Sequence, residues 1–187
     1  MELKEKTCCF TGHRRIPPGQ QHQLARQLEE TVRALVRQGV VYFGAGGALG
    51  FDSLAAQCVL KLREELPQIK LILVLPCLSQ AEHWPASDRE RYEAIKKQAD
   101  KVVYTSKEYT RDCMFRRNRY LVDHSSVCVC YLAERGGGTA YTVQYAKLQE
   151  LKIINLAALP KGDGQDENNQ ETGKITGMQG GLCGETR

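Results

Sequence analysis

Two glycine-rich segments of this chain have the composition and spacing of turns that bind phosphate. They read GAGGALGFD at residues 44–52 and GGGT at residues 136–139, each between a strand-like run and a helix-like run. Glycine lets an anion approach the main chain closely, and the free N–H groups at the start of a helix attract negative charge. Two such turns favour a nucleotide-type ligand; for the second, a flexible turn without a ligand is the alternative. The candidate ligand-binding residues are Gly44, Gly46, Gly47, Gly50, Gly136, Gly137, Gly138 and Thr139.

The segment TGHRR at residues 11–15 follows the first strand-like run. We expect Thr11 and Gly12 to form the turn and to contact the ligand. Arg14 can form two parallel hydrogen bonds with a phosphate. His13 is a candidate acid, base or ribose contact, with a purely structural histidine as the alternative. For Arg14, the alternative is an arginine that only keeps the loop soluble.

Asp52 and a basic segment add further candidates. Asp52 either contacts a ribose hydroxyl, orders the second-strand loop or caps the following helix. The segment MFRRNRYLVDHS at residues 114–125 holds three arginines, and at 100° per residue Arg116 and Arg119 share a helix face while Arg117 and Asn118 point elsewhere. Arg117 and Asn118 are the candidate contacts for phosphate and ribose. The first glycines lack GxGxxG spacing, so NAD-dependent oxidoreduction is not expected.

The apolar pattern predicts alternating strands and helices. Strands are expected at 7–11, 40–43, 70–75, 101–104, 127–132 and 152–156, and helices at 18–38, 52–66, 87–100, 114–124 and 139–151. Several strands are continuously apolar, as in sheets covered on both faces. We therefore predict a Rossmann-like three-layer α/β sandwich with a mainly parallel sheet of about six strands. The candidate loops should then meet at one sheet edge.

Composition predicts one folded domain at residues 1–159 and a disordered tail at residues 160–187. The tail is rich in Gly, Gln, Asn and Glu and lacks aromatic residues, so it cannot offset its ordering entropy. Residues 1–159 carry 23 basic and 17 acidic side chains, a net charge of +6. This mild excess suits a phosphate-bearing ligand but is small for a dedicated nucleic-acid binder. No apolar run has the roughly 18 residues that a membrane span needs, so we expect a cytoplasmic protein without a membrane partner.

The cysteine pattern predicts reduced, buried thiols rather than disulfides or a metal site. Six of the eight cysteines lie within apolar runs and lack paired metal-ligand spacing such as CxxC: Cys8, Cys9, Cys58, Cys77, Cys128 and Cys130. We expect no required cofactor and no metal.

The four motifs TGHR, GAGGALGFDSLAA, FRRNRYLVDHS and GGGTAYTVQYA, in this order, resemble the YpsA-type branch of the SLOG superfamily over about residues 5–157. That resemblance implies a sensor or processor of a nucleotide-derived ligand such as ADP-ribose or an NAD-like molecule. It makes a nucleotide-type small molecule the expected partner. Pairing through exposed helices in relatives makes a homodimer an expectation as well.

Two other branches of the superfamily imply alternatives. In DprA-like proteins, which bind single-stranded DNA, a GxAxGID loop and an FxxRNR segment correspond here to Gly47–Asp52 and Phe115–Arg119, so weak single-stranded DNA binding is one alternative. LOG-like phosphoribohydrolases use an arginine that corresponds to Arg117 and a glutamate whose place is taken here by Thr142. Cleavage of an N-glycosidic or phosphoester bond, with His13 or Asp52 as acid or base, is the other alternative.

Overall fold

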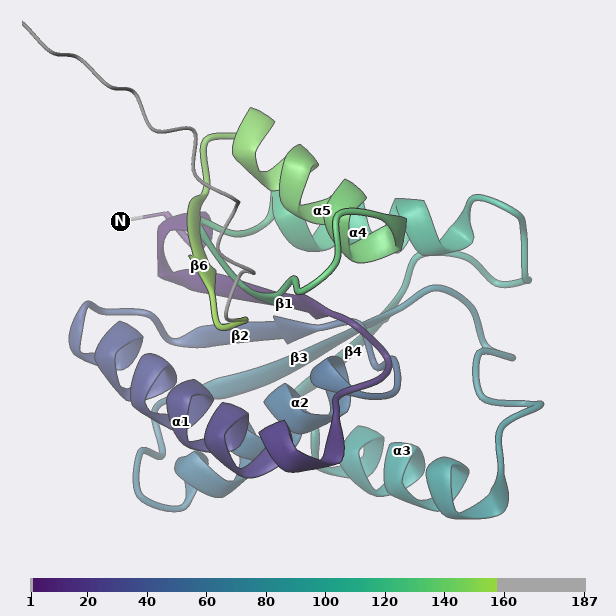
Figure 1. Cartoon of the computed structure of the whole chain (residues 1–187), viewed down its shortest axis with the longest axis horizontal. Coiled ribbons are helices and arrows are strands. Elements are labelled where there is room, and N and C mark those ends of the chain that lie inside the picture. Colours follow the sequence, from purple (N-terminus) through teal and green to yellow (C-terminus); the bar gives the residue numbers. More distant parts are fainter. Residues whose placement is uncertain (1, 158–187) are drawn as a thin grey trace, which may run out of the picture.

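The computed structural model describes residues 2–157 as a six-stranded sheet between two layers of helices (Figure 1). The strands are β1 (Thr7–Gly12), β2 (Tyr42–Ala45), β3 (Lys70–Leu75), β4 (Lys101–Tyr104), β5 (Val127–Tyr131) and β6 (Lys152–Asn155). The helices are α1 (Gln21–Arg37), α2 (Phe51–Arg63), α3 (Ala86–Gln98), α4 (Cys113–Asp123) and α5 (Gly137–Leu148). The predicted Rossmann-like fold is confirmed. The predicted domain boundary at residue 159 and the tail beyond it lie outside the described residues.

All strand pairs are parallel, and the order across the sheet is β4-β3-β2-β1-β5-β6. The chain builds outward from β1 through β2, β3 and β4, then crosses to the other side of β1 to add β5 and β6. The strand order therefore reverses between β1 and β5, where Gly12 lies beside Tyr131 at the carboxyl ends. Open α/β sheets bind their ligands at such a reversal.

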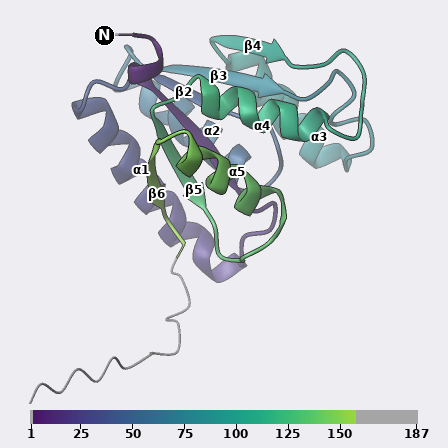
Figure 2. The ribbon, with the colours of Figure 1, turned by 90° about the horizontal axis from the view of Figure 1, so that it is seen from above.

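Both faces of the sheet are covered. Helices α1, α2 and α3 lie on one face, and α4 and α5 lie on the other (Figures 1 and 2). Helix α1 has an apolar stripe that recurs every three or four residues and packs on the sheet. Its buried residues are Leu24, Leu28, Val32 and Leu35. Coverage on both sides explains why β5 is buried along its whole length and reads as a continuous apolar run.

Strand β2 differs from the prediction because Gly44 belongs to it. The strand was expected to end at residue 43, with Gly44 opening the turn, but Gly44 is paired with Cys9 of β1 and Ile72 of β3. A Cβ at Gly44 would lie 2.9 Å from a methyl carbon of Leu121. Gly44 thus lets α4 pack closely against the sheet, and it is not part of the turn.

Helix α5 also begins earlier than predicted, at Gly137 rather than at residue 139. Glycine has a low helix propensity, and this led to the later predicted start. The difference moves two glycines from the turn into the first turn of the helix. Thr139 is consequently inside α5 and does not cap it.

Candidate functional site

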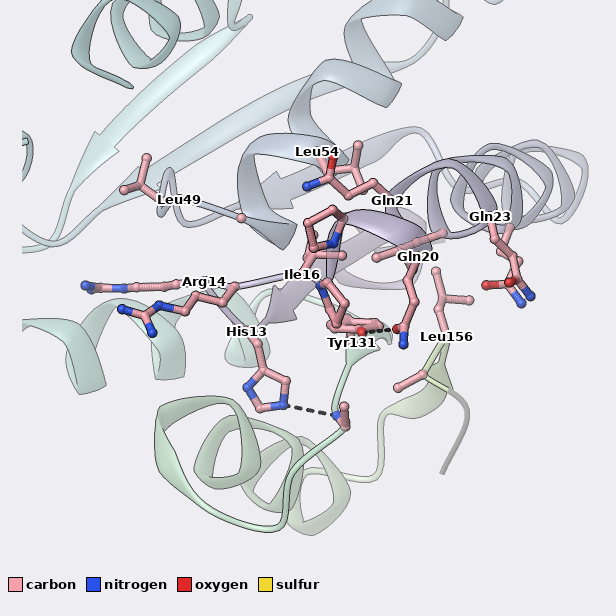
Figure 3. Close-up of a pocket in the computed structure, with 18 of the residues that line it drawn as sticks. His13, Arg14, Ile16, Gln20, Gln21, Gln23, Leu49, Leu54, Tyr131 and Leu156 are labelled. Carbon is pink, nitrogen blue, oxygen red and sulfur yellow. Dashed lines mark hydrogen bonds between the residues drawn. The ribbon is translucent and has the colours of Figure 1, made fainter. Parts of the chain in front are cut away.

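The three loops with the predicted site residues meet at the carboxyl edge of the sheet. The main chain of His13 joins them, because its N–H donates to the Tyr131 carbonyl at 3.3 Å and its carbonyl accepts from the Phe51 N–H at 3.2 Å. The His13 side chain adds a second link, since its Nε2 accepts from the N–H groups of Ala133 at 3.0 Å and Glu134 at 3.2 Å (Figure 3). The structure thus brings the segments at residues 11–15, 44–52 and 132–139 together.

A broad groove of about 1560 Å³ opens beside these loops and continues along helix α1. Near the strand ends it is lined by His13, Arg14, Gly50 and Tyr131 (Figure 3). Arg14 and its neighbour Arg15 are exposed, and neither forms an ion pair with any of residues 2–157. The groove therefore carries two exposed positive charges on the β1–α1 loop, and the carboxylate of Glu134 is also among its lining groups.

The turn between β2 and α2 is packed against protein atoms. A Cβ at Gly46 would overlap the Arg117 guanidinium, and one at Gly50 would overlap the Arg14 carbonyl. Gly47 has a φ of +65°, which disfavours other residues, and it faces the side chains of Leu75 and Tyr92. Internal packing accounts for these glycines without a ligand. The structure places Gly44, Gly46 and Gly47 below the surface.

Asp52 and Arg117 form a buried ion pair beneath this turn. Asp52 Oδ2 lies 3.7 Å from Arg117 Nη1, and each residue is 6% exposed. Asp52 also accepts from the Ala48 N–H at 3.4 Å, and Arg117 donates to the Gly46 carbonyl. Asp52 therefore orders the loop. The alternative that it caps α2 is wrong, because the N-cap of that helix is Gly50 and no side chain caps it.

Burial is the largest influence on the pKa of both Asp52 and Arg117. It raises the pKa of Asp52, while the charges of Arg117 and Arg14 and the N–H groups of Ala48 and Gly46 act in the opposite direction. Burial also lowers the pKa of the Arg117 guanidinium, which the charge of Asp52 opposes. The charge of Arg14 thus acts on both members of the pair, although Arg14 is exposed and they are buried.

The turn between β5 and α5, unlike the β2–α2 turn, is not packed against protein atoms. Gly136, Gly137 and Gly138 are exposed, and a Cβ at any of them would meet nothing within 4 Å. Gly137 has a φ of +83°, whereas Gly136 is extended. No side chain caps the start of α5. The first N–H groups of the helix accordingly open to the surface, and Thr139 is buried just behind them.

The side chain of Asn118 in α4 is hydrogen-bonded to α5. Its Nδ2 donates to the Thr142 hydroxyl at 2.8 Å, and that hydroxyl donates to the Gly138 carbonyl at 2.8 Å. Thr142, which replaces the glutamate of the LOG-like pattern, is 2% exposed. The expected ribose contact by Asn118 thus competes with a structural hydrogen bond between α4 and α5.

Gln80 is a site neighbour that the sequence did not reveal. Its Nε2 donates to the carbonyls of Gly46 at 3.4 Å and Gly47 at 3.2 Å, and the residue is 8% exposed. Gln80 lies in the irregular segment after β3, where no periodicity marks a buried residue. Its only signal is position, since it follows the carboxyl end of a strand on the same sheet edge.

Residues 2–157 hold no group of three or more His, Cys, Asp or Glu side chains placed to bind a metal ion. In the same range, no helix combines the length and apolar character needed to cross a membrane. The cysteines described there are free, and all but Cys58 among them are buried.

Solved structures with a similar fold include two DNA processing proteins. DNA processing protein A from Helicobacter pylori, whose single-stranded DNA binding mode has been described, matches with a TM-score of 0.57 at 20% identity, over 80% of this chain and 64% of that one. DprA from Streptococcus pneumoniae matches with a TM-score of 0.60 at 18% identity, over 81% of this chain and 50% of that one. The chain thus spans half to two thirds of these proteins, and at such identity the likeness shows the fold.

Sequence comparison identifies the family. A UPF0398 protein of Halalkalibacterium halodurans is 32% identical over 130 residues, covering 68% of this chain and 69% of the relative. A UPF0398 protein of Bacillus velezensis is 29% identical over 127 residues, covering 66% and 70%. The YpsA family model, described as the YspA SLOG family, matches residues 18–157, which include the β2–α2 turn, the buried ion pair and the start of α5. The chain therefore belongs to the YpsA family of SLOG proteins.

Proposed function

We propose that this protein binds a phosphate-bearing, nucleotide-derived small molecule, such as ADP-ribose, an NAD-like molecule or a nucleoside phosphate, at the strand reversal between β1 and β5. The open start of α5 carries this proposal. There, Gly136, Gly137 and Gly138 leave free space beside N–H groups that lack intrahelical partners. An anion at such a helix start gains hydrogen bonds and a favourable interaction with the helix dipole.

The surrounding charges support the same ligand class. Arg14 and Arg15 stand exposed at the groove, and their guanidinium groups can each form two hydrogen bonds with a phosphate. Arg117, in contrast, is balanced by Asp52 inside the protein. The cationic part of the proposed site is therefore the β1–α1 loop, and the buried pair keeps the neighbouring turn in shape.

Cleavage of the ligand is less well supported than binding. The LOG-like glutamate position holds Thr142, whose hydroxyl is engaged with Asn118 and Gly138. Asp52 is paired with Arg117, and His13 Nε2 already accepts two hydrogen bonds. A general acid or base needs a free proton-transfer atom. Among these groups only Nδ1 of His13 has no partner within residues 2–157, so we propose a binding or sensing function.

Thermal shift against ADP-ribose, NAD, AMP, ADP and ATP tests the proposal, because a ligand that binds only the folded state raises the melting temperature. The decisive variant is Gly138→Asp. Free space surrounds Gly138, and an acidic residue in the first turn of a helix is favourable, so the fold should persist. The introduced carboxylate repels a phosphate, and we expect the affinity of the responding nucleotide to fall about tenfold or more.

The matched control is Gly19→Asp, which adds the same charge at another glycine with nothing within 4 Å. A second pair compares Arg14→Ala with Arg26→Ala, because both arginines are exposed but only Arg14 lines the groove. Equal affinity in Gly138→Asp and Gly19→Asp would contradict the site. No response to any of the five compounds would contradict the ligand class.

A second candidate function, weak binding of single-stranded DNA, is favoured by an aromatic cluster between α4 and α5. Phe115 is 43% exposed and packs edge-on against Tyr141 with 4.8 Å between ring centroids. Arg119 donates to the Tyr141 hydroxyl at 2.7 Å. Exposed aromatic rings beside arginine are the surface on which proteins stack single-stranded bases. The DNA processing proteins that share the fold make this a specific alternative.

Fluorescence anisotropy with a short oligonucleotide at low and moderate salt tests this alternative. Contacts with several phosphates release counterions, so affinity should fall steeply with salt. Phe115→Ala should weaken binding about tenfold, whereas Tyr109→Ala, which removes another exposed aromatic ring, should not. Absence of binding at low salt would reject this function.

A further inference from the structure

His13 has a defined tautomer because of the two hydrogen bonds at its Nε2. Backbone N–H groups only donate, so the nitrogen that faces Ala133 and Glu134 must be an unprotonated acceptor. A neutral imidazole carries one proton, which then resides on Nδ1. The arrangement of the neighbouring main chain therefore settles which nitrogen of His13 can donate.

We propose that His13 acts through both nitrogens: Nε2 holds the β5–α5 loop in place, and the Nδ1–H group donates a hydrogen bond to an oxygen of the bound ligand. The contact of Nε2 with the loop is seen in the structure itself. The second part rests on the proposed nucleotide-binding function. Together they make His13 a positioning and ligand-contacting residue and not an acid or base that works through Nε2.

The ring is fixed in an orientation that suits this use. It packs edge-on against the Tyr131 ring, with centroids 6.0 Å apart and an interplanar angle of 82°. Tyr131 is itself fixed, because its hydroxyl donates to Gln20 at 2.7 Å and its ring stacks on Phe51. In Figure 3 the second ring nitrogen of His13 points away from the dashed hydrogen bond of the first, and the residue lines the groove. No partner for Nδ1 is found within residues 2–157.

The loop that His13 holds is the one that leads into the open start of α5. Ala133 and Glu134 precede the three glycines, which supply no side chain to anchor the segment. The imidazole satisfies two main-chain donors at the base of this turn, and the His13 N–H is itself bonded to the Tyr131 carbonyl. Losing the Nε2 acceptor should thus release the main chain that presents the glycines.

Two substitutions separate the functions of the two nitrogens. The side-chain oxygen of His13→Gln can reach the place of Nε2 and accept from the loop, but this variant lacks the Nδ1–H donor. The amide nitrogen of His13→Asn can take the place of Nδ1 and donate, but this shorter side chain lacks the loop acceptor. Gln therefore holds the loop without the donor, and Asn keeps the donor without holding the loop.

The tautomer and the loop are tested first, without a ligand, by NMR of the full chain. Histidine-labelled protein should show His13 protonated at Nδ1 and not at Nε2, with the signal assigned by its loss in His13→Gln. The amides of Ala133 and Glu134 should exchange with solvent about tenfold faster in His13→Asn than in wild type or His13→Gln. A proton on Nε2, or equal exchange rates in all three proteins, would overturn the positioning function.

The donor function is then tested by titration with ADP-ribose. His13→Gln should bind about tenfold more weakly than wild type, the loss of roughly one hydrogen bond, while its loop amides stay protected. Unchanged affinity in that variant would overturn the donor function. If wild type binds no ADP-ribose while the tautomer and exchange results hold, the proposed ligand fails and the positioning of the loop by His13 stands.

Discussion

The sequence predicted that Arg117 and Asp52 lie at the same edge of the sheet, but it did not predict that the two side chains contact each other. Their separation of 65 positions in the chain hides the contact, which arises only when α4 packs over the β2–α2 turn. A buried ion pair contributes little net stability. Removal of one partner is nevertheless strongly destabilising, because it leaves the other charge buried and unpaired in the protein interior. Arg117 is therefore unsuitable as a simple test of ligand binding.

A double-mutant cycle on this pair should show strong coupling. Arg117→Met leaves Asp52 buried and unpaired, and we expect a loss of about 3–5 kcal/mol in the free energy of unfolding, measured by urea denaturation. Adding Asp52→Asn removes the stranded charge, so the double variant should be more stable than Arg117→Met alone. Additive losses would show that the two side chains do not interact, contrary to the structure.

At the scale of elements, periodicity located the six strands and the five α-helices of residues 2–157, because each buries an apolar face of its own. It failed at two glycine boundaries. Gly137 and Gly138 lie within α5 although a Cβ at either would meet nothing within 4 Å, and the low helix propensity of glycine led to the later predicted start. Gly44 lies within β2 under Leu121, a placement that depends on a neighbour from a distant segment, which a local pattern does not contain. The same holds for Gln80, whose hydrogen bonds reach back to the β2–α2 turn.

At the amino edge of the sheet, Asp100, which precedes β4, links this strand to β3 and α2. It accepts from the Leu71 N–H at 2.9 Å and from Arg63 at 2.7 Å, and it pairs with Lys70 at 3.2 Å. Burial raises the pKa of Asp100, but the Leu71 N–H, Lys70 and Arg63 together lower it further, so the pKa lies below that of an ordinary aspartate. Its contribution to stability is present above the unfolded pKa of about 3.9 and is lost as the pH falls through the lower folded value.

Asp100→Asn should therefore destabilise the protein by about 1–2 kcal/mol at neutral pH, because it replaces charge-assisted hydrogen bonds with neutral ones. The deficit should shrink as the pH is lowered below about 4 and the wild-type carboxylate is protonated. Urea denaturation across this pH range measures it. Asp112→Asn, at an exposed carboxylate paired with Arg116, serves as the control and should change stability little. A constant deficit at all pH values would contradict this assignment.

For the whole molecule, the sequence predicted the class of fold and the sheet edge at which the candidate loops meet. The prediction worked because alternating strands and helices lead to parallel strands whose carboxyl ends share one edge. The sequence could not show which of the two glycine turns is packed inside the protein and which is exposed. One glycine turn is closed around a buried ion pair, and the other opens to solvent at the reversal between β1 and β5. In the first turn Arg117 of α4 occupies the space beside Gly46, whereas a Cβ at Gly136, Gly137 or Gly138 of the second turn would meet nothing within 4 Å.

The most direct test of nucleotide binding at this edge is an amide NMR titration of the full chain with ADP-ribose, NAD and AMP. The account predicts that at least one of them shifts the amides of His13, Arg14 and residues 136–139 most strongly, and leaves Asp100 at the opposite edge unchanged. Chemical shifts that stay constant with all three compounds, or changes centred on the outer face of α4 around Phe115, would contradict it.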